Sequence, residues 1–171
     1  MSDGDARALI LTLRLDAESF ARLDGLRRAH FPPELNHLRA HLTLFHHLPG
    51  ERLAEVRDTL AASADRPPIP LAFTGLRSLG RGVAFEVAAP ELGRLRAELA
   101  ARFRPHLSPQ DAQGFRPHVT VQNKVEPEAA RALKAELEAG FAPWEGRGEA
   151  LLLHRYLGGP WALEAELPFR G

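Results

Sequence analysis

Apolar positions along the chain switch between the period of two that is typical of strands and the three-to-four spacing that is typical of helices. Turns rich in Gly and Pro separate these segments. The mixture of both kinds of segment predicts an α+β fold. The pattern predicts strands over 8–15, 40–48, 71–79, 83–88, 116–125, 148–157 and 161–169, and helices over 17–29, 51–64, 90–104 and 128–139.

The order of the predicted elements repeats along the chain. Strand, helix, strand, helix and strand occur once before the turn at Gly80 and once after it. A chain of 171 residues has the size of one domain. The repeat therefore predicts a single domain, 1–171, with two pseudo-symmetric units at about 1–80 and 81–171. Such symmetry would place the middle strands of the two units side by side across a central groove.

The middle strand of each unit carries the same short motif. It reads His41-Leu42-Thr43-Leu44 in the first unit and His118-Val119-Thr120-Val121 in the second, 77 residues later. Because side chains alternate faces along a strand, the His and the Thr share one face and the aliphatic residues point to the core. One such tetrapeptide would carry little weight, whereas two in equivalent contexts indicate a common function.

Two imidazoles and two hydroxyls that converge on one cleft suit phosphodiester chemistry. The reaction needs a base for the attacking water, an acid for the departing sugar oxygen and donors for the charged phosphate oxygens. We predict that His41 and His118 supply the acid and the base, because the pKa of histidine lies near neutrality. Thr43 and Thr120 are the predicted phosphate donors. The near symmetry leaves open which histidine is the base, and the chemistry requires no metal and no other cofactor.

The paired motifs, their spacing and the duplicated element order resemble the 2H phosphoesterase superfamily, which includes the 2′-5′ RNA ligase-like proteins. The segment Phe115-Arg116-Pro117-His118-Val119-Thr120-Val121 is especially similar to the second motif of that family, where Pro often precedes the His. The first motif has Ala40 at that place. The resemblance covers nearly the whole chain. It implies a duplicated, bilobal fold in which two antiparallel sheets flank a central cleft, with helices outside and with strands of the two halves able to interleave.

The resemblance also implies an activity. Members hydrolyse 2′,3′-cyclic phosphates or 2′-5′ linkages and weakly catalyse the reverse joining. Motifs and resemblance together predict a metal-independent phosphodiesterase that acts on an RNA end or a small cyclic nucleotide, with no obligate protein partner. The alternative is a noncatalytic module that binds RNA ends or nucleotides in the same cleft. A structural domain with coincidental motifs is a third and more remote interpretation.

Four further residues are candidate substrate contacts. Lys124 lies six residues after the second motif histidine, an even offset that keeps it on the catalytic face of a regular strand. Phe45 shares the face of the first motif's His and Thr, where it could stack on a base or pack in the core. Arg155 and Tyr156 lie near the end of a late strand, where only one of them can face the cleft.

Charge and composition narrow the class of partner. The chain has 22 basic and 22 acidic side chains and no cysteine. A zero net charge gives no global field to hold long nucleic acid, so an anionic substrate needs a local basic cleft. The lack of Cys excludes disulfides and thiolate ligands. No apolar run has the length of a membrane span and the first residues lack a signal-peptide pattern, so we expect a cytoplasmic protein that binds no membrane.

A histidine cluster raises the alternative of a metal site. Its four members fall within eleven residues: His37, His41, His46 and His47. In a regular strand the third motif-strand histidine, His47, would lie about 20 Å from His41, whereas zinc needs donors at about 2.0–2.1 Å. The serines also lack the Gly-x-Ser-x-Gly frame of a hydrolase triad. We therefore predict neither a metal ligand set nor a nucleophilic serine.

Overall fold

The computed structural model describes residues 5–171. Every predicted helix and strand is present in this part of the chain, which confirms the α+β fold. The strands are β1 Leu9–Leu15, β2 Leu42–Leu48, β3 Ile69–Ser78, β4 Val83–Ala88, β5 His118–Gln122, β6 Trp144–Tyr156 and β7 Trp161–Pro168. The helices are α1 Ala17–His30, α2 Leu53–Ser63, α3 Pro90–Phe103 and α4 Pro127–Ala139, with short 3-10 turns at Pro33–Leu35, Gly50–Arg52 and Arg104–His106.

The seven described strands form one antiparallel sheet. Its order is β2-β1-β6-β3-β4-β5, and β7 pairs with β6 off this path. This order is palindromic: when β1, β2 and β3 are matched to β4, β5 and β6, it reads the same from either end. Each half of this six-strand path thus holds the first two strands from one half of the chain and the third strand from the other. A duplicated unit that exchanges its last strand would produce this order, and the division into units at about 1–80 and 81–171 stays a prediction.

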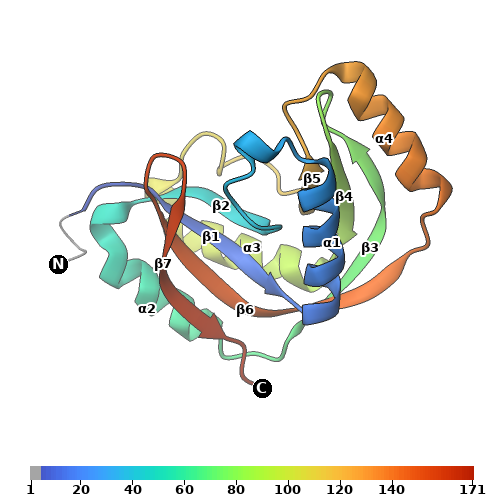
Figure 1. Cartoon of the computed structure of the whole chain (residues 1–171). Helices are drawn as coiled ribbons and strands as arrows, with labels where there is room; N and C mark the ends of the chain where they lie inside the picture. The colour runs from blue at the N-terminus through green and yellow to red at the C-terminus, as the bar shows by residue number, and fades with distance from the viewer. Residues whose placement is uncertain (1–4) are drawn as a thin grey trace.

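The prediction of two separate sheets is wrong, because β6 belongs to both halves. Residues 144–148 of β6 pair with β3. Residues 148–155 pair with β1, and residues 150–156 pair with β7 on the opposite edge. The long strand therefore carries hydrogen bonds from one half of the sheet to the other without a break. Figure 1 shows β6 running from one side of the molecule to the other.

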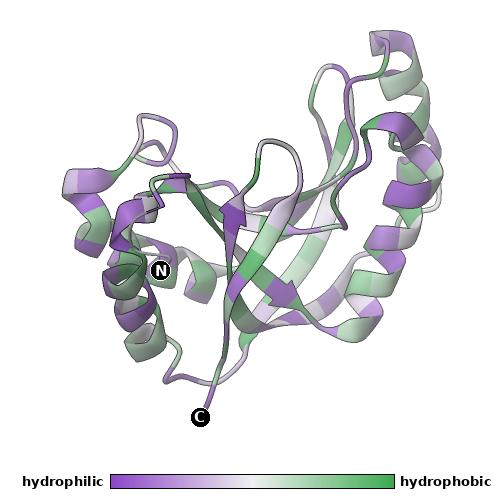
Figure 2. Cartoon of the chain, turned by 60° about the vertical axis from the view of Figure 1, so that its left-hand side comes forward, coloured by the Kyte–Doolittle hydropathy of each residue, from purple (hydrophilic) through white to green (hydrophobic). Residues whose placement is uncertain are grey.

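The helices pack on the sheet in two pairs, and each pair has one helix from each half of the chain. α1 packs mainly on β5, and α4 packs on β3 and β4 (Figure 1). α2 and α3 pack together, and their buried leucines join one core with the apolar residues of β1 and β2. Figure 2 shows hydrophobic residues concentrated along the strands, whereas the helices mix hydrophobic and hydrophilic positions. None of the helices in residues 5–171 is long and apolar enough to cross a membrane.

Each motif contains a β-bulge at its fourth residue. Thr43 and Phe45 lie opposite consecutive residues of β1, so Leu44 is an extra residue in β2. The second motif repeats this arrangement at Val121, opposite β4. A bulge shifts the alternation of faces by one residue. As a result, both the bulge residue and the residue after it point into the core.

The second bulge turns Gln122 into the core, where it is 6% exposed. Its Oε1 has no hydrogen-bond partner within the described residues, and a buried polar atom without a partner costs about 1–3 kcal/mol. We therefore expect Gln122→Met, which is similar in size, to raise the melting temperature by about 2–4 °C in a thermal unfolding experiment. Gln113→Met changes an exposed residue and is the control. A melting temperature no higher than that of the control would contradict this expectation.

Candidate functional site

Both motifs open onto one cleft of ≈ 420 Å³. β2 and β5 are the two ends of the main strand order, yet they contact each other, so the sheet curves around the cleft. His41 lies directly before β2, and His118 is the first residue of β5. Side chains of the motifs and of neighbouring elements line the cleft: His41, Thr43, His118, Thr120, His46, Arg77, Asp111, Arg116 and Trp161 are among them. The structure thus brings the four motif residues together, and their catalytic roles stay predictions.

The two motif histidines are held in the same way. Nδ1 of His41 lies 2.7 Å from the carbonyl oxygen of Arg39, and Nδ1 of His118 lies 2.9 Å from that of Arg116. In each case the carbonyl belongs to the residue two positions earlier. A carbonyl can only accept, so this contact places the proton on Nδ1 and leaves Nε2 to take up or release a proton.

Burial lowers the pKa of His41 to about 4, because little water reaches its charged form. The hydrogen bond to the Arg39 carbonyl acts in the opposite direction and favours the protonated ring. The positive charge of Arg27 and the nearby rings of His154 and His46 lower the pKa further. His41 is therefore neutral at physiological pH, which suits a general base.

Burial also lowers the pKa of His118, and its neighbours act in both directions. The Arg116 carbonyl and the Glu86 carboxylate favour the protonated ring, whereas the Arg77 guanidinium disfavours it. Nη2 of Arg77 lies 2.7 Å from Nδ1 of His118, but the proton on that nitrogen bonds to the Arg116 carbonyl, so the guanidinium acts on the ring through its charge. Arg77 and Arg116 both lie near Glu86, at 3.6 and 3.5 Å. Two guanidiniums that share one carboxylate make this side of the cleft positive.

His46 is a third imidazole in the cleft, and from the sequence it was a candidate only for a metal site. The carboxylate of Asp111, which is 1% exposed, accepts hydrogen bonds from the backbone N–H groups of His46 and His47, both at 2.8 Å. Nδ1 of His46 lies 3.3 Å from the same carboxylate. Burial raises the pKa of Asp111, but the hydrogen bonds from His46 and His47 outweigh burial and keep this pKa below its usual value. The bulge in β2 places His46 on the face where Phe45 was expected.

Two buried arginines hold the motif strands, and neither was predicted from the sequence. Arg27 of α1 donates to the carbonyl of Thr120 at 3.2 Å. Arg96 of α3 donates to the carbonyl of Leu44 at 2.7 Å and to that of Asp111 at 2.7 Å. Each arginine thus ties a helix from one half of the chain to the motif strand of the other half. A signal was present, because each lies four residues after a buried leucine and so on the apolar face of its helix.

Phe45 and Lys124 do not lie on the catalytic face. Phe45 is fully buried and its ring packs edge-on against Phe103, so its role is core packing and the candidate base contact is wrong. β5 ends at Gln122, and Lys124 follows in a left-handed turn with φ of 64°. The bulge and this turn remove Lys124 from the alternation that its even offset assumed. Its side chain is exposed and does not line the cleft.

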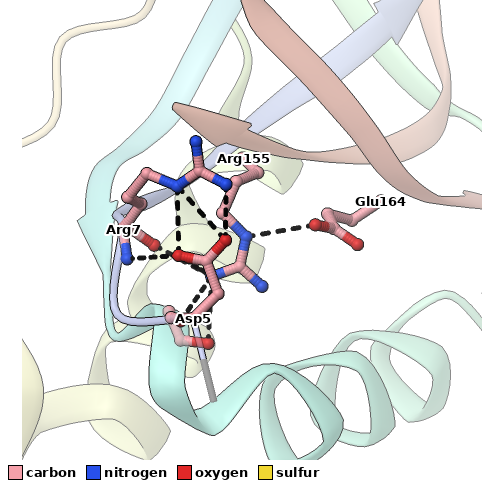
Figure 3. A network of polar contacts seen from close by, with 5 residues as sticks. Asp5, Arg7, Arg155 and Glu164 are labelled. Atoms are coloured by element: carbon pink, nitrogen blue, oxygen red, sulfur yellow. Dashed lines mark hydrogen bonds and ion pairs between the residues drawn. The ribbon is translucent and has the colours of Figure 1, made fainter. Parts of the chain in front are cut away.

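Arg155 and Tyr156 also lie away from the cleft. Arg155 is 1% exposed and donates to three backbone carbonyls, those of Asp5, Arg7 and Gly50. Figure 3 shows its guanidinium enclosed by Asp5, Arg7 and Glu164, with the Glu164 carboxylate at 3.1 Å. The prediction that Arg155 contacts the substrate is therefore wrong. Tyr156 is 42% exposed at the end of β6 and does not line the cleft.

Within residues 5–171, no three His, Asp or Glu side chains gather closely enough to hold a metal ion. The histidines of the cluster form no such group. His41 and His46 line the cleft, His37 and His41 line a neighbouring pocket, and His47 is exposed on β2.

Comparison with known proteins identifies the family of this chain. A family model described as the 2′-5′ RNA ligase superfamily matches residues 15–160. No curated protein matches the chain.

Solved structures agree with this fold. The crystal structure of a phosphoesterase is 21% identical with a TM-score of 0.62, over 98% of this chain and 100% of that chain. TT0787 of Thermus thermophilus is 20% identical with a TM-score of 0.65, over 96% and 98%. E. coli LigT complexed with NADP+ is 19% identical with a TM-score of 0.62, over 98% and 100%. The fold, the paired motifs and the family match agree, and the chain belongs to the 2′-5′ RNA ligase superfamily of 2H phosphoesterases.

Proposed function

We propose that the cleft is the active site of a metal-independent phosphodiesterase. It acts on 2′,3′-cyclic phosphates or on 2′-5′ linked RNA ends or nucleotides, with weak joining as the reverse reaction. The observation that carries the proposal is the matched pair of histidines, each held through Nδ1 by the same carbonyl contact and each beside a threonine in one cleft. The hydroxyls of Thr43 and Thr120 and the cations of Arg77 and Arg116 supply donors and positive charge for a phosphate. The likeness to E. coli LigT, whose structure is complexed with NADP+, supports a substrate of nucleotide type.

The two histidines divide the proton transfers. His41, neutral because of its low pKa, takes a proton from water through Nε2 as the water oxygen bonds to phosphorus. His118, whose pKa is lowered less than that of His41, gives a proton to the ribose oxygen as its bond to phosphorus breaks. The product is a phosphate monoester and a free ribose hydroxyl. Both proton transfers use protein groups, so the step needs no metal-bound water.

The pH dependence of kcat/KM follows from these two pKa values, because kcat/KM reports the free enzyme. Protonation of His41 below its pKa of about 4 removes the base, so activity falls on the acid side. Loss of the proton from His118, whose pKa is lowered from 6.5, removes the acid, so activity falls as the pH rises past that value. We expect a bell-shaped profile with an acidic optimum on 2′,3′-cyclic AMP. An optimum above about pH 7.5 would contradict the assigned roles.

Turnover by chelator-treated protein tests the proposal. The purified protein, treated with EDTA, is assayed against 2′,3′-cyclic nucleotides, 2′-5′ dinucleotides and RNA that ends in a cyclic phosphate. We expect an unchanged rate on at least one of them. Tight binding of all three without turnover would favour the noncatalytic module, and a rate restored only by zinc or manganese would contradict metal independence.

A further inference from the structure

A second cavity of ≈ 650 Å³ adjoins the proposed active site. His41 and Trp161 line both the cleft and this cavity. We call it the apolar pocket, and its walls include Phe20, Leu38, Leu152, His154, Pro160 and Trp161. Its size falls within the range of about 300–1,000 Å³ that is typical of small-molecule sites.

Trp161 lies beside the catalytic imidazole of His41, where the cleft and the apolar pocket meet. Its ring centroid lies 4.9 Å from that of His41, at an interplanar angle of 61°. Its ring centroid also lies 5.2 Å from that of His154, at 47°. A part of the substrate that extends from the cleft into the apolar pocket therefore meets an aromatic surface.

The apolar pocket contains one polar pair away from its rim. Oγ1 of Thr12, a residue that is 1% exposed, lies 3.0 Å from Nε2 of His154. The other ring nitrogen of His154 has no hydrogen bond within residues 5–171. The pair can therefore offer one donor or acceptor to a ligand, depending on the tautomer.

The two arginines at the rim of the apolar pocket are ion-paired. Arg14 forms ion pairs with Glu166 and Glu149. Arg39 lies 3.2 Å from the buried carboxylate of Asp24, which also pairs with Arg28 at 3.5 Å. Both rim arginines therefore already have carboxylate partners.

We infer that the apolar pocket is a binding subsite for a planar, uncharged aromatic group of the substrate, which in a nucleotide is the base. The inference rests on the proposed function, since the phosphate lies between the two motif histidines. An aromatic ring can stack on Trp161. The polar edge of a base can bond to His154, and the largely apolar walls match its lack of charge. The two sides of the cleft thus orient the substrate, with the base toward His41 and charged groups toward Arg116.

A pocket-filling substitution tests the inference. Leu152→Phe adds volume inside the apolar pocket, and Leu163→Phe makes the same change at a residue that is 57% exposed on β7. Each variant is assayed with 2′,3′-cyclic AMP and with methyl riboside 2′,3′-cyclic phosphate, which lacks the base. We expect Leu152→Phe to raise KM for 2′,3′-cyclic AMP by roughly 10-fold or more and to leave the base-free substrate unaffected. Equal effects on both substrates, or no effect, would overturn the inference.

A binding measurement separates this inference from the proposed catalysis. Trp161 is one of only two tryptophans in the chain, so its fluorescence reports occupancy of the subsite. We expect 3′-AMP to quench the emission of the wild type and of Leu163→Phe, and ribose 5-phosphate to leave it unchanged. Quenching by 3′-AMP without turnover of any cyclic phosphate would support the subsite and refute the catalytic proposal. Turnover without base-dependent quenching would do the reverse.

Discussion

Replacing either His41 or His118 with alanine is expected to lower kcat/KM on a 2′,3′-cyclic nucleotide by about 10²-fold or more, because each change removes a whole proton-transfer role. The double variant should be scarcely less active than the weaker single variant, since residues that act as a unit are not additive. The measurement is kcat/KM for both single variants and the double variant under identical conditions.

His47→Ala is the matched control for these variants. His47 lies on the same strand, but its side chain is exposed and does not line the cleft. Its contact with Asp111 runs through the backbone N–H, which the substitution leaves in place. We expect the control to keep wild-type activity. Full activity in either motif-histidine variant would refute the catalytic assignment and leave the cleft as a binding site.

Replacing Arg155 with Met is expected to lower the free energy of unfolding by about 3–5 kcal/mol, as is typical when one partner of a buried ion pair is removed. The substitution leaves the carbonyl oxygens of Asp5, Arg7 and Gly50 without their donor. It also leaves the Glu164 carboxylate, whose side chain is 21% exposed, without its cation. Urea unfolding measures the loss.

The same variant distinguishes a structural role from a substrate contact. At a temperature where the variant is folded, we expect its KM for a cyclic nucleotide to match that of the wild type, because Arg155 does not line the cleft. Arg57→Met, at an exposed arginine of α2, should change neither stability nor KM. Wild-type stability together with a raised KM in Arg155→Met would show that Arg155 contacts the substrate after all.

Local periodicity predicted the order of the elements because most strands and helices bury one face. The start of β6 is an exception, because its local sequence does not predict a strand. Residues 144–147 include Gly146 between Glu145 and Arg147, a pattern that does not favour a strand. This segment is a strand because it pairs with β3. That pairing between distant parts of the chain is also what merges the two expected sheets into one, and local sequence does not encode it.

Within the motifs, the alternation of side chains between the two faces of a strand predicted side-chain positions correctly only up to the threonines. A bulge depends on how a strand pairs with its neighbour, and the periodicity of a single strand does not report that pairing. Regular alternation, which does not include the bulge at Leu44, placed Phe45 in the cleft. Because of the bulge, His46 lies there instead. The equivalent bulge at Val121 helps to explain why Lys124 was placed on the wrong face. Arg27 escaped notice because a charged residue on a helix suggests exposure, whereas this one bonds to a strand carbonyl.

The palindromic strand order is also the order that two copies of a half-length chain would make if they formed a homodimer by exchanging their last strands. In such a dimer the catalytic centre would lie on the twofold axis, and each copy would supply one histidine and one threonine. A site of that kind would treat both sides of a phosphodiester alike. Fusion into one chain allows the sides to diverge: β7, which carries Trp161, is matched to no other described strand and lies on only one side. A symmetric dimer of half-length chains without that strand would bind its substrate equally well in either direction.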